Sequence, residues 1–163
     1  MKQILIIRHA KSSWAQVGQE DFDRPLNERG QRDAPMMAQR MLDRNIQINA
    51  FVSSTANRAF TTAGYFAKAY GVSKKEIRGT KQLYHAYPAA YYEVISKLED
   101  SITTVAIFAH NPGITLFANE LTNTKIDNMP TCSVCAVEIN IDKWKDFTKS
   151  KRELLFFYTP ERL

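Results

Sequence analysis

Two kinds of hydrophobic pattern alternate along this chain, and together they predict strands that alternate with helices. Short runs of apolar and β-branched residues are typical of strands, and unbroken runs indicate strands that are buried on both faces. Such runs occupy residues 4–7, 50–52, 104–109, 134–139 and 154–158. Between them, apolar residues recur at i, i+3, i+4 and i+7, which is the spacing of an amphipathic helix. These helical stripes begin at Ala34, Ala56, Tyr91 and Ile114.

Glycine and proline refine two of these helices. Gly71 follows the last apolar residue of the second stripe and is well placed to end that helix. Pro35 falls inside the first stripe, and proline lacks the N–H that a helix interior requires. We therefore expect the first helix either to begin near Asp33 or to kink at Pro35.

The alternation of strands and helices predicts the fold class. It favours an α/β protein, a three-layer α/β/α sandwich with a mostly parallel central sheet and helices on both faces. The last two predicted strands are joined by a short polar segment around Trp144, so we expect one antiparallel edge. The 163 residues contain no internal repeat, low-complexity tract or linker, which predicts a single domain over residues 1–163.

Composition and charge exclude several classes of function. Lys and Arg number 22 against 17 Asp and Glu, a net charge of +5, but the basic residues are dispersed. The densest basic run, residues 73–76, contains an acid, so we expect no nucleic-acid partner. The longest apolar runs have five residues, whereas a membrane span needs about 20. The N-terminal apolar stretch is also too short for a signal peptide, so we expect a cytoplasmic protein. Nothing in the sequence indicates an obligate partner, so we expect a monomer.

The only cysteines, Cys132 and Cys135, form a C-x-x-C pair inside a predicted strand. Positions three apart on a strand point to opposite faces, so we expect two reduced core cysteines and not a redox pair. Two thiols cannot complete a zinc site, and no histidine lies at ligand spacing from them. The sequence therefore predicts no metal site here.

Polar residues with catalytic potential follow three of the predicted strands. Arg8 and His9 follow the first strand, Arg58 lies in the first turn of the helix after the second, and His110 and Asn111 follow the strand at 104–109. In open α/β sheets, ligands bind beyond the carboxyl ends of the strands, where helix N-termini add N–H donors. A single histidine in such a place is often structural, but three strand ends that deliver arginines and histidines to one edge predict a phosphate site.

Histidines and arginines around a phosphate suggest one mechanism in particular. A neutral imidazole can attack phosphorus and form a phosphohistidine that water then hydrolyses. Neighbouring cations lower the pKa of the histidine, and a backbone acceptor for Nδ1 would leave Nε2 free to attack. The cations also hold the phosphoryl oxygens during transfer. No carboxylate cluster suited to a metal is present, so we expect neither a metal nor a cofactor.

Four segments in order resemble the motifs of a known family. Residues 4–12, 23–30, 53–63 and 108–113 resemble those of the histidine phosphatase superfamily, which has the phosphoglycerate mutase-like fold. The resemblance is greater to its small branch, the SixA-type phosphohistidine phosphatases, and covers nearly the whole chain. One departure is Ala10, where the superfamily usually has glycine; the loop there must avoid positive φ.

The resemblance implies roles for individual residues. His9 would be the nucleophile, and the family uses no metal. Arg8, Arg58 and His110 would act in catalysis by binding the phosphoryl oxygens, and Arg24 would complete the pocket. Asn111, directly after the second histidine, would be an additional phosphate donor.

The proton donor is the least determined residue. Larger members of the superfamily place a glutamate where this chain has His85, which is therefore a candidate proton donor, although a surface loop residue is the alternative. Asp21 and Asp23 on a loop are other candidates, while Glu93 on a helix is expected to be solvated. An imidazole leaves phosphorus more readily than an alkoxide, so a site without a dedicated carboxylic acid favours a phosphohistidine substrate.

The length of the chain bears on the substrate as well. Only the loop 11–26 and the segment 84–91 could cover the site, and an open rim would admit a phosphohistidine that projects from a protein. We therefore expect a metal-independent phosphatase whose partner is a phosphorylated protein or a small phosphorylated substrate. The alternatives are a small-molecule phosphomonoesterase with the same mechanism and a phosphate-binding module without turnover.

Overall fold

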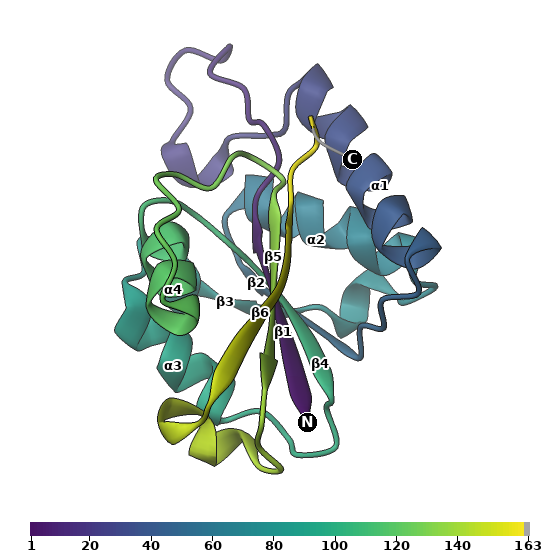
Figure 1. The fold of residues 1–163 in the computed structure, drawn as a ribbon. Coiled ribbons are helices and arrows are strands. Elements are labelled where there is room, and N and C mark those ends of the chain that lie inside the picture. Colours follow the sequence, from purple (N-terminus) through teal and green to yellow (C-terminus); the bar gives the residue numbers. More distant parts are fainter. Residues whose placement is uncertain (162–163) are drawn as a thin grey trace.

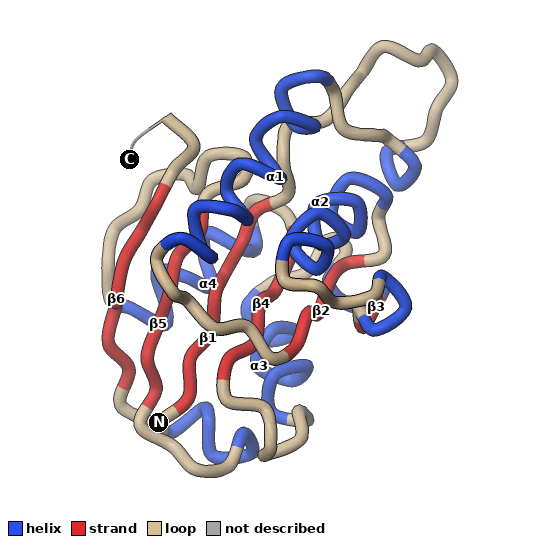
Figure 2. The backbone as a smooth tube through the Cα atoms, turned by 90° about the vertical axis from the view of Figure 1, so that its right-hand side faces the viewer, coloured by secondary structure: helices blue, strands red, loops and turns tan. Residues whose placement is uncertain are grey.

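A six-stranded sheet forms the centre of the computed structural model, which describes residues 1–161 (Figure 1). The sheet has the strand order β3-β2-β4-β1-β5-β6 (Figure 2). Its strands are β1 Lys2–Arg8, β2 Ala50–Ser54, β3 Arg78–Thr80, β4 Thr104–Ala109, β5 Val134–Ile139 and β6 Arg152–Tyr158. Pairs β1–β4, β2–β4 and β2–β3 are parallel, whereas β5 is antiparallel to both β1 and β6. The expected antiparallel edge is thus present, and β5 alone runs against the other five strands.

Helices cover both faces of this sheet, which confirms the three-layer α/β/α arrangement (Figure 2). One apolar core lies under α1 and α2, and a second core lies under α3, α4 and the 3-10 helix η4. The bounds of these elements are α1 Glu28–Asp43, α2 Asn57–Ala69, α3 Pro88–Ser96, α4 Gly113–Thr122 and η4 Trp144–Lys149. Shorter 3-10 turns are η1 Asp21–Asp23, η2 Lys74–Glu76 and η3 Lys81–Leu83. No helix within residues 1–161 is long and apolar enough to span a bilayer.

The expected start of the first helix near Asp33 is wrong. The Asn27 side chain accepts a hydrogen bond from the Gly30 N–H at 2.9 Å, so the helix is capped and begins at Glu28. Pro35 lies inside α1 on its exposed side. Water can therefore bond the carbonyl that the proline leaves without a partner.

Strand β3 was not expected, because its three residues are mostly exposed and carry no apolar pattern. The expectation that both cysteines lie on a strand is wrong for Cys132, which precedes β5 with φ 60°, whereas Cys135 lies on the strand. Both are free and buried, one in each core, as expected for reduced core cysteines. The last two residues of the single domain expected over residues 1–163 lie outside the described residues.

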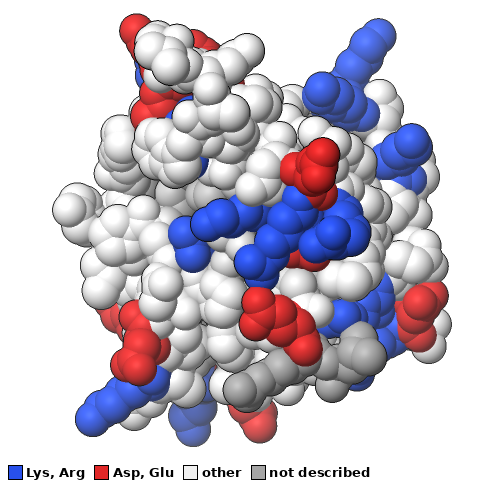
Figure 3. Space-filling model, turned by 90° about the horizontal axis from the view of Figure 1, so that it is seen from above, with Lys and Arg blue, Asp and Glu red and all other residues white. Residues whose placement is uncertain are grey.

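The carboxyl ends of β1, β2 and β4 open onto one end of the molecule, where the loop 11–26 rises above them (Figure 1). The start of this loop packs closely against α1 at Gly30. A Cβ at that position would lie only 2.1 Å from the Lys11 carbonyl oxygen, so a larger residue would not fit. Seen from above, this face carries a group of Lys and Arg side chains near its centre, with acidic side chains beside them (Figure 3). The fold therefore brings the predicted strand ends together on a face that bears positive charge.

Candidate active site

A pocket of about 230 Å³ lies at the carboxyl ends of β1, β2 and β4. Six of the predicted site residues line this one pocket, although they come from four different segments of the chain. They are Arg8, His9, Arg24, Arg58, His110 and Asn111. Of the residues expected at the site, only His85 lies outside it.

His9 is held in one orientation by the backbone that follows it. Its Nδ1 lies 2.7 Å from the Ala10 carbonyl oxygen, and because a carbonyl only accepts, Nδ1 carries the proton. Nε2 then presents its lone pair, with no hydrogen bond to any described residue. Burial is the main cause that lowers the pKa of His9 to about 3; the Ala10 bond opposes it, and the charges of Arg58, Arg8 and Arg24 act with it. His9 is therefore a neutral imidazole at physiological pH.

His110 lies beside His9, with ring centroids 5.1 Å apart. Its Nε2 is 2.8 Å from Ser54 Oγ, which itself accepts a hydrogen bond from the Ala56 N–H at 3.2 Å. When the Ser54 hydroxyl donates its proton to Nε2, the His110 proton lies on Nδ1. Nδ1 is buried and has no partner. Such an orphaned donor fits an oxygen of a bound phosphoryl group.

Burial also lowers the pKa of His110, to about 2, and the neighbouring His9 and Arg58 act in the same direction. Both histidines are hence neutral, and the positive charge of the pocket comes from its arginines.

Asp21 orients two of those arginines. Its Oδ1 accepts from Arg24 Nη1 at 2.9 Å, and its Oδ2 accepts from Arg58 Nη2 at 2.9 Å and from the Tyr84 hydroxyl at 2.7 Å. Burial tends to raise the pKa of Asp21, but the hydrogen bonds from Tyr84, Arg24 and Arg58 outweigh it and hold that pKa well below its usual range. An ionised Asp21 positions the guanidinium groups and is poorly suited to donate a proton.

Arg8 and Asn111 contact the chain between α4 and β5. Arg8 Nη1 donates to the Met129 carbonyl oxygen at 2.8 Å, while its Nε is buried without a partner. The Asn111 amide nitrogen donates to the same oxygen at 3.2 Å and also to Asn128. Asn111 thus anchors this loop, and its role as a phosphate donor stays a prediction.

His85 lines an adjoining hollow of about 120 Å³ that shares His110 and Asn111 with the phosphate pocket. It is exposed, adopts φ 56°, and its ring lies 3.9 Å from that of Tyr84. His85 therefore lies on an exposed loop at the edge of the site, and its role as proton donor stays a prediction. Of the other proton-donor candidates, Asp23 is exposed.

Sequence reasoning missed the contributions of Ser54, Trp14 and the ion pairs of Asp21. Ser54 lies two residues after the predicted strand 50–52, so its position was a usable signal. The spacing of Asp21 and Arg24, three residues apart, was a weaker one. Trp14 had no pattern around it that would place it in the pocket.

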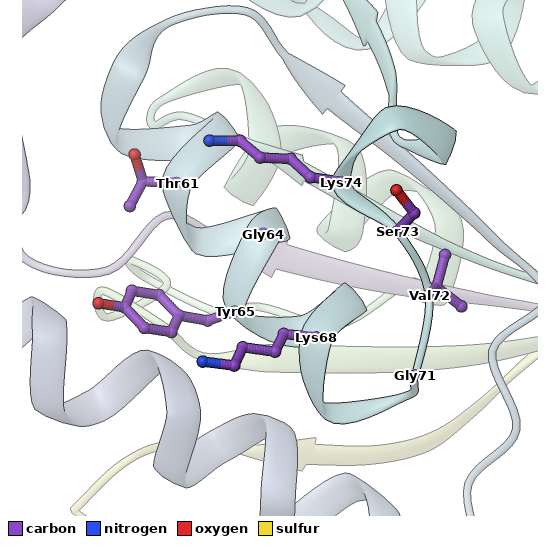
Figure 4. A pocket seen from close by; sticks show the side chains of 8 residues that line it. All are labelled: Thr61, Gly64, Tyr65, Lys68, Gly71, Val72, Ser73 and Lys74. Carbon is purple, nitrogen blue, oxygen red and sulfur yellow. The ribbon is translucent and has the colours of Figure 1, made fainter.

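Within residues 1–161, no three His, Cys, Asp or Glu side chains are placed to hold a metal ion. A larger pocket, of about 680 Å³, runs along the outer side of α2 (Figure 4). Thr61, Tyr65, Lys68 and Lys74 line it, and it includes neither a histidine nor an arginine.

The chain is similar to known proteins in sequence and in fold. The model of the Histidine phosphatase superfamily (branch 1) matches residues 4–84, about half of the chain. An uncharacterized protein of Mycobacterium leprae is 28% identical over 166 residues, covering 94% of this chain and 99% of that protein. The structure of SixA from Agrobacterium tumefaciens, assigned as a phosphohistidine phosphatase, matches with a TM-score of 0.82 and 24% identity over 98% of this chain and 99% of that chain. The mycobacterial glucosyl-3-phosphoglycerate phosphatase complexed with VO3 matches with a TM-score of 0.75 and 16% identity over 96% and 98% of the two chains.

Proposed function

This chain belongs to the histidine phosphatase superfamily, and from that premise we propose that it is a metal-independent phosphatase that works through a phosphohistidine on His9, with phosphohistidine in proteins as its substrate. The observation that carries the proposal is the state of His9. Its Nδ1 proton is bound by the Ala10 carbonyl at 2.7 Å, so the Nε2 lone pair faces a pocket lined by three arginines. That combination suits nucleophilic attack on a phosphoryl group.

In the first step, His9 Nε2 forms a bond to phosphorus as the bond from phosphorus to the leaving group breaks. The phosphoryl oxygens are held by the guanidinium groups of Arg8, Arg24 and Arg58 and by Nδ1–H of His110. Two of these donors, Arg8 Nε and His110 Nδ1, have no partner before substrate binds. They satisfy their hydrogen bonds only when the phosphoryl group arrives, which favours the bound state.

In the second step, water attacks phosphorus, the bond to Nε2 breaks, and His9 returns to its neutral form. The low pKa of His9, about 3, keeps the free nucleophile neutral throughout the physiological range. For the first step we assign proton donation to His85, whose hollow adjoins the pocket through His110. An imidazole leaving group needs this proton less than an alkoxide does, so His85 would matter most for alkyl phosphates.

The choice of a protein substrate rests on the open rim of the pocket and on the fold shared with SixA of A. tumefaciens. The second candidate, a small-molecule phosphomonoesterase, is supported by the same fold in glucosyl-3-phosphoglycerate phosphatase. The ratio of kcat/KM for a phosphohistidine peptide to that for a sugar phosphate decides between them. A ratio well above one supports the first candidate, and a ratio below one supports the second.

Covalent catalysis is tested by trapping. The wild-type protein and His9→Ala are incubated with a phosphohistidine peptide, quenched in alkali and weighed intact by mass spectrometry. We expect the wild type to gain the mass of one acid-labile phosphoryl group and the variant to gain none. If neither protein forms an adduct and neither hydrolyses the donor, the phosphatase proposal is wrong and a phosphate-binding module becomes the better explanation. The cytoplasmic location, the monomeric state and the lack of a nucleic-acid partner stay predictions.

A further inference from the structure

Two exposed aromatic side chains flank the mouth of the phosphate pocket. Trp14 is 77% exposed and lines the pocket itself, whereas Tyr87 is 65% exposed and lines the adjoining hollow. Both cavities are lined by His110 and Asn111, so Trp14 on the loop 11–26 and Tyr87 on the segment 84–91 line adjoining cavities. A group attached to a phosphoryl bound at His9 therefore lies near these two residues.

The loop that carries Trp14 presents a second apolar side chain. Val17, on the same loop, is 104% exposed. Exposed apolar residues that gather beside a binding pocket, with cations nearby, are typical of surfaces that bind another protein. We refer to Trp14 and Tyr87, the two of these residues that line the cavities, as the apolar rim.

Trp14 is held in place by an arginine of the pocket and not by the core. The guanidinium carbon of Arg24 lies 3.2 Å from the ring centroid, and Arg24 is fixed in turn by Ser12 Oγ at 2.5 Å and the Ser13 carbonyl at 3.1 Å. One face of the indole therefore covers Arg24, while most of the ring remains open to solvent. A rigid, exposed indole can bury apolar area at a small cost in conformational entropy.

We propose that the apolar rim is a docking surface for the polypeptide around the phosphorylated residue, and that it makes the enzyme prefer substrates with apolar neighbours. This inference rests on the phosphatase function proposed above. The pocket of about 230 Å³ has room for a phosphoryl group and the ring that carries it. Inorganic phosphate or phosphoramidate would end inside the pocket, whereas a peptide chain that continues from the ring on both sides can reach Trp14 and Tyr87.

The other explanation for Trp14 is that it only positions Arg24. In that case Trp14→Ala would slow every phosphoryl donor by the same factor, whatever surrounds the phosphorus. A docking surface instead predicts a loss that depends on the residues next to the phosphorylated one. The two explanations therefore differ in the ratio of rates between donors.

Binding is measured first, in His9→Ala, so that turnover plays no part. The probes are two peptides with a stable phosphohistidine analogue, one flanked by leucines and the other by serines, and inorganic phosphate. The chain has two tryptophans and Trp144 is fully buried, so acrylamide quenching of fluorescence reports on Trp14. We expect the leucine peptide to bind about tenfold more tightly than the serine peptide and to protect Trp14, while phosphate alone does not. Equal binding of both peptides without protection would overturn the proposal.

Turnover is measured next, with a leucine-flanked phosphohistidine peptide and with phosphoramidate, which has no flanking residues. We expect Trp14→Ala and Tyr87→Ser each to lower the ratio of kcat/KM between the two donors by about tenfold. The matched control is Leu155→Ser, which removes an exposed apolar residue from β6 and should leave the ratio unchanged. An unchanged ratio in Trp14→Ala and Tyr87→Ser would refute the docking surface.

The two proposals can fail separately. If the wild type hydrolyses neither donor while the leucine peptide still protects Trp14, the phosphatase function is wrong and the docking surface stands. If both donors are hydrolysed at the same relative rates in wild type and rim variants, the phosphatase function stands and the docking surface is wrong.

Discussion

The two buried histidines should make the folded protein sensitive to mild acid. Below its ordinary pKa of about 6.5, a histidine in the unfolded chain takes up a proton. In the folded protein, burial and the nearby arginines lower the pKa of His9 to about 3 and that of His110 to about 2. The unfolded state thus binds more protons below pH 6.5, and the free energy of unfolding must fall as the pH falls.

The size of this effect follows from the same pKa values. At pH 5 an ordinary histidine is mostly protonated, whereas both active-site histidines stay neutral in the fold. Each should lower the free energy of unfolding by about 2 kcal/mol between pH 7.5 and pH 5. Asp21 does not contribute in this window: because its folded pKa is depressed, its stabilisation is present above about pH 4 and is lost only in stronger acid.

Urea unfolding at pH 7.5 and pH 5 measures this difference. His9→Asn keeps an N–H near the Ala10 carbonyl, and His110→Gln keeps a polar partner for Ser54, so both variants should fold. We expect each to lose about 2 kcal/mol of the wild-type pH dependence. His85→Gln, which replaces the exposed histidine, serves as the matched control. If His9→Asn and His110→Gln keep the full wild-type pH dependence, the histidines are not the neutral buried groups described above.

Three further predictions follow from contacts around the site. Asp21→Asn should lower the free energy of unfolding by about 1–2 kcal/mol at pH 7.5, because a half-exposed carboxylate loses charge-assisted bonds, and urea unfolding at pH 7.5 checks this against wild type. His85→Ala should lower kcat on an alkyl phosphate by about 10²-fold but change kcat on a phosphohistidine peptide much less, and equal losses on both would contradict its role as proton donor. Gly113→Ala should lower the free energy of unfolding by at least about 2 kcal/mol in thermal unfolding, since its Cβ would lie 1.8 Å from the Ala86 oxygen. In the control Gly64→Ala the Cβ meets nothing within 4 Å, so the free energy of unfolding should rise by up to about 1 kcal/mol.

Hydrophobic periodicity was sufficient for the central elements of the fold. The apolar runs and helical stripes correspond to five of the six strands and to all four α-helices, because buried strands and amphipathic helices must carry those patterns. It was insufficient at the edge strand β3, whose residues are mostly exposed, and at the start of α1, where the cap by Asn27 decided the boundary. Exposed and capping residues carry little periodic signal, so sequence pattern locates them poorly.

For the active site, the sequence predicted the location but not the state of its residues. Its position was determined by the sequence, because residues that directly follow parallel strands must meet at one edge of the sheet, as Arg8, His9 and His110 do. What only the tertiary structure decided is the state of those residues. Asp21 reaches Arg24 and Arg58 across the folded loop, the Ala10 carbonyl fixes the His9 tautomer, and burial lowers the histidine pKa values. The Asp21–Arg58 contact and the desolvation of the histidines depend on segments far apart in the chain, and the His9–Ala10 bond depends on the backbone conformation after β1; all three exist only once the chain has folded.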